Sequence, residues 1–338
     1  MEPSTQAGEQ PRPARRRLLI GAAGAALASF AGGAGSLAAT AYPSKPLRLV
    51  IPYPPGGPTD IVGRIVAATL AEKLGQSVVV ENRPGASGMI GADAVAKAAP
   101  DGYVLLVNVS GQLVNPALYP NMPYDPLKDF RGITNLASTP IQLVVSSNSP
   151  VRSVADLVAL VRREPGRHNF ASSSSGAPGH LAGEVFKTAA KLDVTHIPYK
   201  GSAPALTDVM GGQVTYMLDS MPSSISFVKG GRLRALAVTA DQRVAALPDV
   251  PTFAELGYPN VNLTSWYGMW APANTPSDLI ASLYRNVSNV LKQADVRARL
   301  IDAQAMPVGD TPEHFDAFCR SEAKRYSDIV RLAGIRLQ

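Results

Sequence analysis

The pattern of hydrophobic and polar positions is clearest between residues 47 and 75. Residues 47–51 read Leu-Arg-Leu-Val-Ile, a short apolar run of strand length. From residue 61 to residue 74 apolar side chains recur at helical spacing, and Gly75 supplies the expected stop. The pattern predicts a strand, an open loop and the N-terminus of a helix, with the loop at Tyr53-Pro54-Pro55-Gly56-Gly57-Pro58-Thr59-Asp60.

This loop is suited to an anion such as a carboxylate. Its prolines cannot continue a strand, and its glycines allow a guest close to the backbone. Free N–H groups and the positive end of the helix dipole would face the loop. Thr59 or Asp60 can cap the helix through a side-chain oxygen. An ordinary strand-to-helix turn without a ligand fits the same residues equally well.

The same order of elements returns along the chain. A predicted strand is followed by a Gly- or Ser-rich loop three more times, at residues 85–88, 108–111 and 172–176. Another predicted strand, residues 214–219, ends on a carboxylate, and Pro198-Tyr199-Lys200-Gly201 precedes a further helix. Alternating units of this kind predict an α/β fold with a mostly parallel sheet and ligands at the carboxyl ends of its strands.

Two strand patterns predict how the chain divides into lobes. Residues 142–147 and residues 267–271 are each followed by an Asn-Xaa-Pro tripeptide and a helical pattern. We expect these strands to be paired crossovers between two lobes. Lobe 1 would then be residues 42–142 plus 268–338, and lobe 2 residues 143–267. A cleft between lobes is a common place for a small-molecule site.

The first 41 residues have the composition of a signal peptide. Arg15-Arg16-Arg17 precedes a weakly apolar run, and Ala39-Thr40-Ala41 offers small residues for a signal peptidase. The paired arginines before Leu18-Leu19 also allow a twin-arginine signal, so export by the Sec or the Tat route stays open. The run is long enough for an uncleaved anchor, but its glycines and alanines favour cleavage. We expect a periplasmic mature protein.

Charge and cysteine content exclude several classes of function. The net charge is +6, of which the first 41 residues contribute +2, and no basic stripe with interleaved aromatic residues is present, so nucleic-acid binding is not expected. Cys319 is the single cysteine, which rules out an internal disulfide and a cysteine-based metal site. Phosphate-loop and zinc-protease motifs are missing, so no cofactor or metal is expected.

Several strings, in this order, resemble the solute receptors of tripartite tricarboxylate transporters, the TctC-type or Bug family. Besides the 54–60 loop, they are Tyr42-Pro43-Ser44-Lys45-Pro46, Glu81-Asn82-Arg83-Pro84-Gly85-Ala86-Ser87-Gly88, Pro100-Asp101-Gly102-Tyr103, Pro198-Tyr199-Lys200-Gly201 and Leu247-Pro248-Asp249-Val250-Pro251-Thr252. The resemblance implies a two-lobed type II periplasmic binding fold, with mixed sheets and flanking helices, that closes on a small di- or tricarboxylate without catalysis. It also implies membrane permease subunits as partners. We expect a monomer.

On this resemblance, loops of both lobes contact the ligand. Lobe 1 would contribute Tyr53, Gly56, Gly57, Thr59, Asp60, Ser87 and Ser110. Lobe 2 would contribute Ser173, Ser174, Lys200 and Asp219.

Most of these residues also have an alternative interpretation. The Asp60 carboxylate would repel an anion, and capping of the first helix explains it equally well. The serines at 172–175 can form a plain polar loop, and Lys200 can be a solvated lysine rather than a counter-charge. Ser110 lies in a stretch, residues 108–112, that departs from the family pattern. His180 is expected to form a structural hydrogen bond.

Two other functions are alternatives to that of a transport receptor. A secreted serine hydrolase using Ser87 or Ser174 would need a general base, but the chain has only four histidines and no Gly-Xaa-Ser-Xaa-Gly elbow. A sensor accessory would capture the same ligand and present it to a histidine kinase ectodomain. Nothing in the sequence separates that role from transport.

Overall fold

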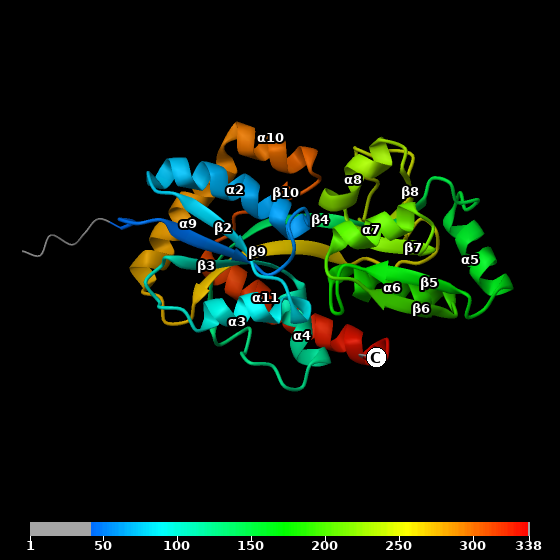
Figure 1. The fold of residues 1–338 in the computed structure, drawn as a ribbon, viewed down its shortest axis with the longest axis horizontal. Helices are drawn as coiled ribbons and strands as arrows, with labels where there is room; N and C mark the ends of the chain where they lie inside the picture. The colour runs from blue at the N-terminus through cyan, green and yellow to red at the C-terminus, as the bar shows by residue number, and fades with distance from the viewer. Residues whose placement is uncertain (1–41, 337–338) are drawn as a thin grey trace, which may run out of the picture. The chain divides into compact units, whose positions relative to one another are not determined.

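The first predicted unit is present as strand β1 (Leu47–Ile51), an open loop and helix α2 (Pro58–Leu74). The computed structural model describes residues 42–336, so the predicted signal peptide lies outside the described residues (Figure 1). Gly57 is the N-cap of α2, and Gly75 ends it in the left-handed conformation, with φ +63°, that glycine adopts at low cost. The local pattern therefore predicted the C-terminal end of this helix. The expected cap by a side chain of Thr59 or Asp60 is wrong, because the helix begins at Pro58 and no side chain caps it.

The strands form one mixed sheet in the order β2-β1-β3-β9-β4-β7-β5-β6, with β8 and β10 also paired to β4. Pairing is parallel within β2-β1-β3 and within β7-β5-β6, and antiparallel wherever β4 or β9 takes part. The remaining strands are β2 (Val78–Asn82), β3 (Val104–Val109), β4 (Phe130–Ser146), β5 (His168–Ser172), β6 (Val194–Pro198), β7 (Tyr216–Ser220), β8 (Leu233–Val238), β9 (Thr264–Pro272) and β10 (Met306–Pro307).

Helices cover the sheet. Figure 1 shows α2 and α10 on one side of β1 to β3, and α3, α4 and α11 on the other. The helices besides α2 are the 3₁₀ turn η1 (Ala86–Gly88), α3 (Met89–Ala96), α4 (Gly111–Leu118), α5 (Val154–Arg163), α6 (Pro178–Ala190), α7 (Ser202–Met210), α8 (Met221–Lys229), α9 (Ser277–Lys292), α10 (Ala294–Asp302) and α11 (Pro312–Leu332). None of the helices within residues 42–336 is both long and apolar enough to span a membrane.

The long strand β4 links the two parallel groups. Its residues 130–140 pair with β9, and its residues 141–146 pair with β7 and β8. The sequence pattern located only the second half, because the first half contains Gly132, Asn135 and Pro140, which are residue types depleted in strands. The lobe boundaries at residues 142/143 and 267/268 stay a prediction.

The core below the strands is rich in aromatic side chains. Trp266 and Trp270 of β9 pack on Phe315 of α11, with ring centroids 5.9 and 5.1 Å apart. The Trp266 indole N–H donates to the Glu322 carboxylate at 3.1 Å, which satisfies a buried donor. These contacts join β9 to the C-terminal helix and support the strands that carry the loops described next.

Candidate ligand-binding site

Four strand-to-helix loops surround a cavity of about 580 Å³. They are residues 52–54 after β1, 84–88 after β2, 173–175 after β5 and 198–201 around the end of β6. The cavity therefore lies at the carboxyl ends of parallel strands, where open α/β sheets bind ligands. Its volume is within the range of small-molecule sites.

Four helix N-termini meet around a second, smaller cavity of about 20 Å³. Thr59 of α2, Gly179 of α6, Ser202 of α7 and Ser220 directly before α8 line it. In Figure 1 the start of α2 lies close to α7 and α8. A helix start carries partial positive charge and N–H groups without intrahelical partners. The convergence of four starts makes this cavity favourable for negative charge.

Pro54 separates the two cavities. A Cβ atom added to Gly201 would lie only 3.2 Å from the Pro54 ring, so the loops of residues 52–57 and 198–201 touch here. Tyr53, Pro54, Ser173 and Gly201 line both cavities. At about 20 Å³ the smaller cavity has room for about one water molecule. A larger guest must move these two loops apart.

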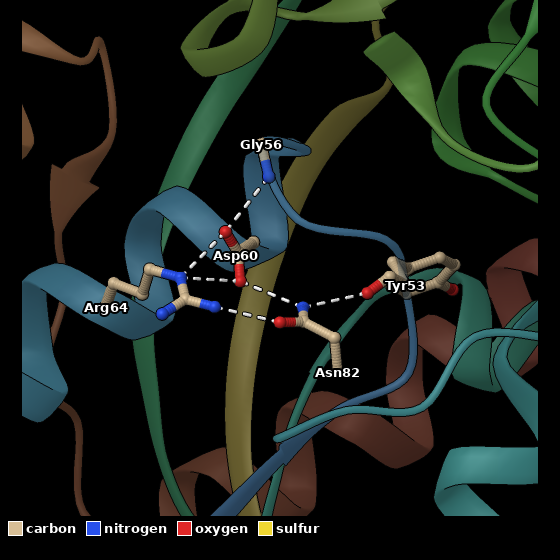
Figure 2. A network of polar contacts seen from close by, with 5 residues as sticks. All are labelled: Tyr53, Gly56, Asp60, Arg64 and Asn82. Carbon is tan, nitrogen blue, oxygen red and sulfur yellow. Dashed lines mark hydrogen bonds and ion pairs between the residues drawn. The ribbon is translucent and has the colours of Figure 1, made fainter. Parts of the chain in front are cut away.

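A buried carboxylate fixes the conformation of the β1–α2 loop. Figure 2 shows Asp60 accepting hydrogen bonds from the Gly56 N–H (3.0 Å), the Arg64 guanidinium (2.9 Å) and the Asn82 amide (2.9 Å). The same Asn82 amide donates to the Tyr53 carbonyl at 2.9 Å. Burial alone would raise the pKa of Asp60, but the hydrogen bonds from Arg64, Gly56 and Asn82 outweigh it and hold that pKa below its ordinary value.

This network decides which N–H groups of the loop are open to a ligand. The Gly56 N–H is already used by Asp60, and φ of +80° at Gly56 favours glycine there. No hydrogen bond within the described chain engages the N–H groups of Gly57, Thr59 or Asp60. Gly57 and Thr59 also line the smaller cavity, so their N–H groups are available as donors to an anion there.

The loop that carries Ser87 is held in a strained conformation. Gly85, Ala86, Ser87 and Gly88 all have positive φ, at +137°, +46°, +53° and +87°. Two of them are not glycine, and such residues cost about 1–3 kcal/mol each. The Ser87 hydroxyl contacts the Tyr119 hydroxyl at 2.7 Å, which helps to keep this shape. The loop thereby forms one wall of the larger cavity.

Two stacked histidines support the serine loop from behind. The imidazoles of His180 and His196 lie 3.9 Å apart, centroid to centroid. His180 Nδ1 accepts a hydrogen bond from the Gly176 N–H at 3.0 Å, the structural role expected for it. His196 Nε2 lies 2.7 Å from the Ser172 hydroxyl. Burial lowers the pKa of His180 to about 4 and that of His196 to about 3, so both rings are neutral at pH 7.

Asp219 forms part of the opposite wall of the smaller cavity. It is the fourth residue of β7 and is 3% exposed. Its carboxylate accepts hydrogen bonds from the Ser202 hydroxyl at 2.8 Å and from the Ser223 hydroxyl. Burial raises the pKa of Asp219 to about 6, although the serine hydrogen bonds act in the other direction.

The remaining predicted residues differ in their access to the cavities. Ser173 and Ser174 line the larger cavity, and Ser173 the smaller one as well. Lys200 lines the larger cavity as an exposed side chain at its edge. Ser110 is fully buried at the start of α4 and lines neither cavity, and Asp60 lies behind the loop. The roles of all five residues in binding stay predictions.

Sequence reasoning did not identify the residues that hold the two aspartates. These are Arg64 and Asn82 around Asp60, and Ser202 and Ser223 around Asp219. Arg64 follows Asp60 by four residues on one helix, which is a signal for a pair on one helix face. Asn82 comes from another strand, and its contact has no local signal.

Two other hollows lack this convergence of donors. One of about 240 Å³ lies behind the serine loop, and its charged groups include Lys187 and Glu184, already paired at 3.4 Å. Another of about 740 Å³ lies along the C-terminal half of α11. It is lined by the C-terminal half of α6 and by Asn260, Asn262 and Leu263 rather than by helix starts. We therefore take the two cavities joined at Pro54 as the candidate site.

Comparison with known proteins now gives the family. Residues 62–335 match the tripartite tricarboxylate transporter family receptor, TctC. The chain belongs to this family. Protein BugT of Bordetella pertussis is 37% identical over 310 residues, which cover 91% of this chain and 95% of the relative. The resemblance first noted from short strings is thereby confirmed.

Solved structures agree with this assignment. Rpa4515 of R. palustris, solved with adipate, is 37% identical with a TM-score of 0.85 and covers 88% of this chain and 100% of its own. MatC of Rhodopseudomonas palustris, solved with bound malate, is 33% identical with a TM-score of 0.82 and covers 86% and 100%. The TctC-family chain thus has the two-lobed α/β fold of periplasmic binding proteins, as predicted, and is a non-catalytic solute receptor.

Proposed function

We propose that this protein is a periplasmic receptor that captures a small dicarboxylate or related organic acid and delivers it to the membrane subunits of a tripartite tricarboxylate-type transporter. The observation that carries the proposal is the meeting of four helix N-termini at one cavity. Relatives solved with adipate and malate support the same ligand class. Residues 1–41 would direct export to the periplasm.

The proposed binding mode places one ligand carboxylate at the start of α2. The N–H groups of Gly57 and Thr59 would donate to it, with the Thr59 hydroxyl and Ser173 nearby. The rest of the ligand would extend into the larger cavity beside Ser87, Ser174 and the edge at Lys200. The N–H groups and the helix dipoles would hold the charge, without a buried arginine or lysine.

The first test is thermal unfolding with a panel of carboxylates that includes adipate, malate and citrate. A ligand of the folded state raises the unfolding midpoint with its concentration, by about 2.7 kcal/mol at a hundred times its dissociation constant. A rise with at least one acid is expected. Unchanged midpoints, also after unfolding, dialysis and refolding to remove a carried-over ligand, would contradict the proposal.

A substitution at Gly57 tests the site itself. Gly57 has φ of −77°, which any residue can adopt, and an added Cβ would meet only the Pro54 carbonyl at 3.6 Å. The fold should therefore tolerate a side chain at this position. Gly57→Leu should fill the smaller cavity and weaken binding by a factor of at least about 100, with about 1 kcal/mol of stability lost at the cap. Ala68→Leu, on the exposed face of α2, is the matched control. Calorimetry showing equal affinity in both variants would remove Gly57 from the site.

A further inference from the structure

The negative charge of ionised Asp219 would repel an anionic ligand bound in the smaller cavity. It lines the same small cavity as Gly57 and Thr59, the donors assigned to the ligand carboxylate. A carboxylate bound there would face Asp219 across a space of about 20 Å³. Two ionised carboxylates at such a short distance repel each other strongly when little water separates them.

Among the described residues, no charged group compensates Asp219. Its partners are neutral. They are the hydroxyls of Ser202, Ser223 and Ser224 and the backbone N–H of Ser220, and α6 contributes the backbone of Gly179. Opposite it on β4 is Gln142, a neutral amide that donates to Ser224 at 2.8 Å. Within residues 42–336, no lysine or arginine pairs with Asp219.

The titratable groups that face Asp219 are phenols. Tyr267 of β9 is fully buried, and its pKa is raised by burial and further by the charge of Asp219. Tyr53 lines both cavities, and burial likewise raises its pKa. Both phenols are therefore neutral in the physiological range, so neither one balances or competes for the charge of Asp219.

The hydrogen-bond geometry can accommodate a proton on Asp219. The Ser223 hydroxyl lies within reach of two acceptors, the Asp219 carboxylate and the Ser220 carbonyl at 3.0 Å. If Asp219 is protonated, the Ser223 hydroxyl can donate to Ser220 and accept from the Asp219 acid instead. Every donor keeps an acceptor, so protonation leaves no buried polar group without a partner.

We propose that Asp219 couples ligand capture to proton uptake, so that the receptor binds an anionic carboxylate with Asp219 in its neutral acid form. The proton comes from solvent, and no bond of the ligand changes. The inference rests on the proposed function. The pKa of about 6 in the ligand-free protein sets the pH above which binding requires proton uptake. Above about pH 6 the free receptor must first gain a proton, and affinity falls by about tenfold for each further pH unit.

The experiment is isothermal titration calorimetry with adipate and malate as probes, from pH 6 to pH 8. These acids are ionised in this range, so their own titration contributes little. At pH 7, titrations in two buffers of different ionisation enthalpy count the protons bound. We expect uptake of close to one proton per ligand, and a dissociation constant that rises with pH.

The variant Asp219→Asn tests whether Asp219 is the group that takes up the proton. Its amide can accept from Ser202 and donate to Ser223, so the fold is retained, while nothing titrates at this position. The variant should bind without proton uptake and with a dissociation constant that no longer depends on pH. Asp241→Asn, at an exposed loop position, is the matched control and should behave like the wild type.

The outcomes separate this inference from the function on which it rests. Binding by the wild type without proton uptake, or an unchanged pH dependence in Asp219→Asn, would overturn the role of Asp219 and leave the receptor function standing. No binding of any carboxylate would overturn both. If Asp219→Asn did not fold, as judged by circular dichroism, the proton count of the wild type would still decide.

Discussion

Two buried aspartates lie in or next to the wall of the smaller cavity, and they are held in opposite ways. Asp60 accepts hydrogen bonds from Arg64, Asn82 and a backbone N–H, and its pKa is held below its ordinary value. Among the described residues, Asp219 has only neutral partners, namely serine hydroxyls and the Ser220 backbone N–H, and burial raises its pKa to about 6. The comparison indicates that a buried carboxylate paired with a cation stays ionised and holds the loop in place, whereas one without a cation titrates near neutral pH. We call Asp60, in this structural role, the brace.

Their positions fit these two roles. Asp60 lies behind the β1–α2 loop and fixes the backbone that presents Gly57 and Thr59, without lining a cavity itself. Asp219 lies directly in the wall of the smaller cavity. In the proposed binding mode, Asp60 shapes the site from outside, while Asp219 faces the ligand.

The largest expected effect comes from removing the brace. Asp60→Ala leaves Gly56 N–H, Arg64 and Asn82 without their acceptor and frees the loop. We expect the free energy of unfolding to fall by about 2–4 kcal/mol and ligand affinity to fall by at least about tenfold. Urea denaturation and calorimetry measure the two quantities, with Asp241→Ala as the control. A stable variant with unchanged affinity would show that Asp60 does not shape the site.

The second effect is a difference in the pH dependence of stability. Because the pKa of Asp219 is raised from its ordinary 3.8 to about 6, its contribution to stability is complete below about pH 4 and is lost as the pH rises through about 6. Asp219→Asn should therefore gain stability relative to the wild type by about 2–3 kcal/mol between pH 4 and pH 8. Denaturant midpoints across this range measure it.

The contribution of Asp60 to the free energy of unfolding changes with pH in the opposite direction. Since its pKa is lowered, the stability that it contributes is present above its ordinary pKa and is lost as the pH falls below that value. Asp60→Asn should therefore be less stable than the wild type at pH 7, by an amount that shrinks towards pH 3. Curves of the same sign for both variants would contradict the contrast between brace and titratable group.

The smallest expected effect is at Lys200. Its side chain is exposed at the edge of the larger cavity, where water and salt screen its charge. Lys200→Ala should weaken binding by no more than about threefold at low salt. The difference in affinity from the wild type should vanish in about 0.5 M NaCl. A loss of tenfold or more that persists in high salt would assign Lys200 a direct ion pair with the ligand.

Local patterns predicted much of the fold. Hydrophobic spacing and the positions of Gly and Pro predicted the β1–α2 unit, the Gly75 stop and the strand that ends near Asp219. Helix α4 was missed, because Pro116 within it argues against a helix and because Ser110–Gln112 read as a loop. The mixed sheet differs from the mostly parallel one that the repeating units predict, because β4 and β9 run antiparallel to their neighbours.

The candidate site was predictable only in its parts. Each loop that lines the cavities could be found as a strand-to-helix turn, but the meeting of four helix starts depends on topology that no local pattern encodes. The same holds for Asn82, which reaches Asp60 from a strand 22 residues away. The hydrogen-bond partners, which separate Asp219 from Asp60 in charge behaviour, are likewise a property of the folded chain.

The most direct test of the account is a crystal structure of the protein grown with adipate or with whichever acid raises its unfolding midpoint most. We predict a ligand carboxylate with oxygen atoms about 3 Å from the N–H groups of Gly57 and Thr59, with Pro54 moved away from Gly201. A ligand bound elsewhere, or one whose carboxylate is held by an arginine or lysine instead of these N–H groups, would contradict the account.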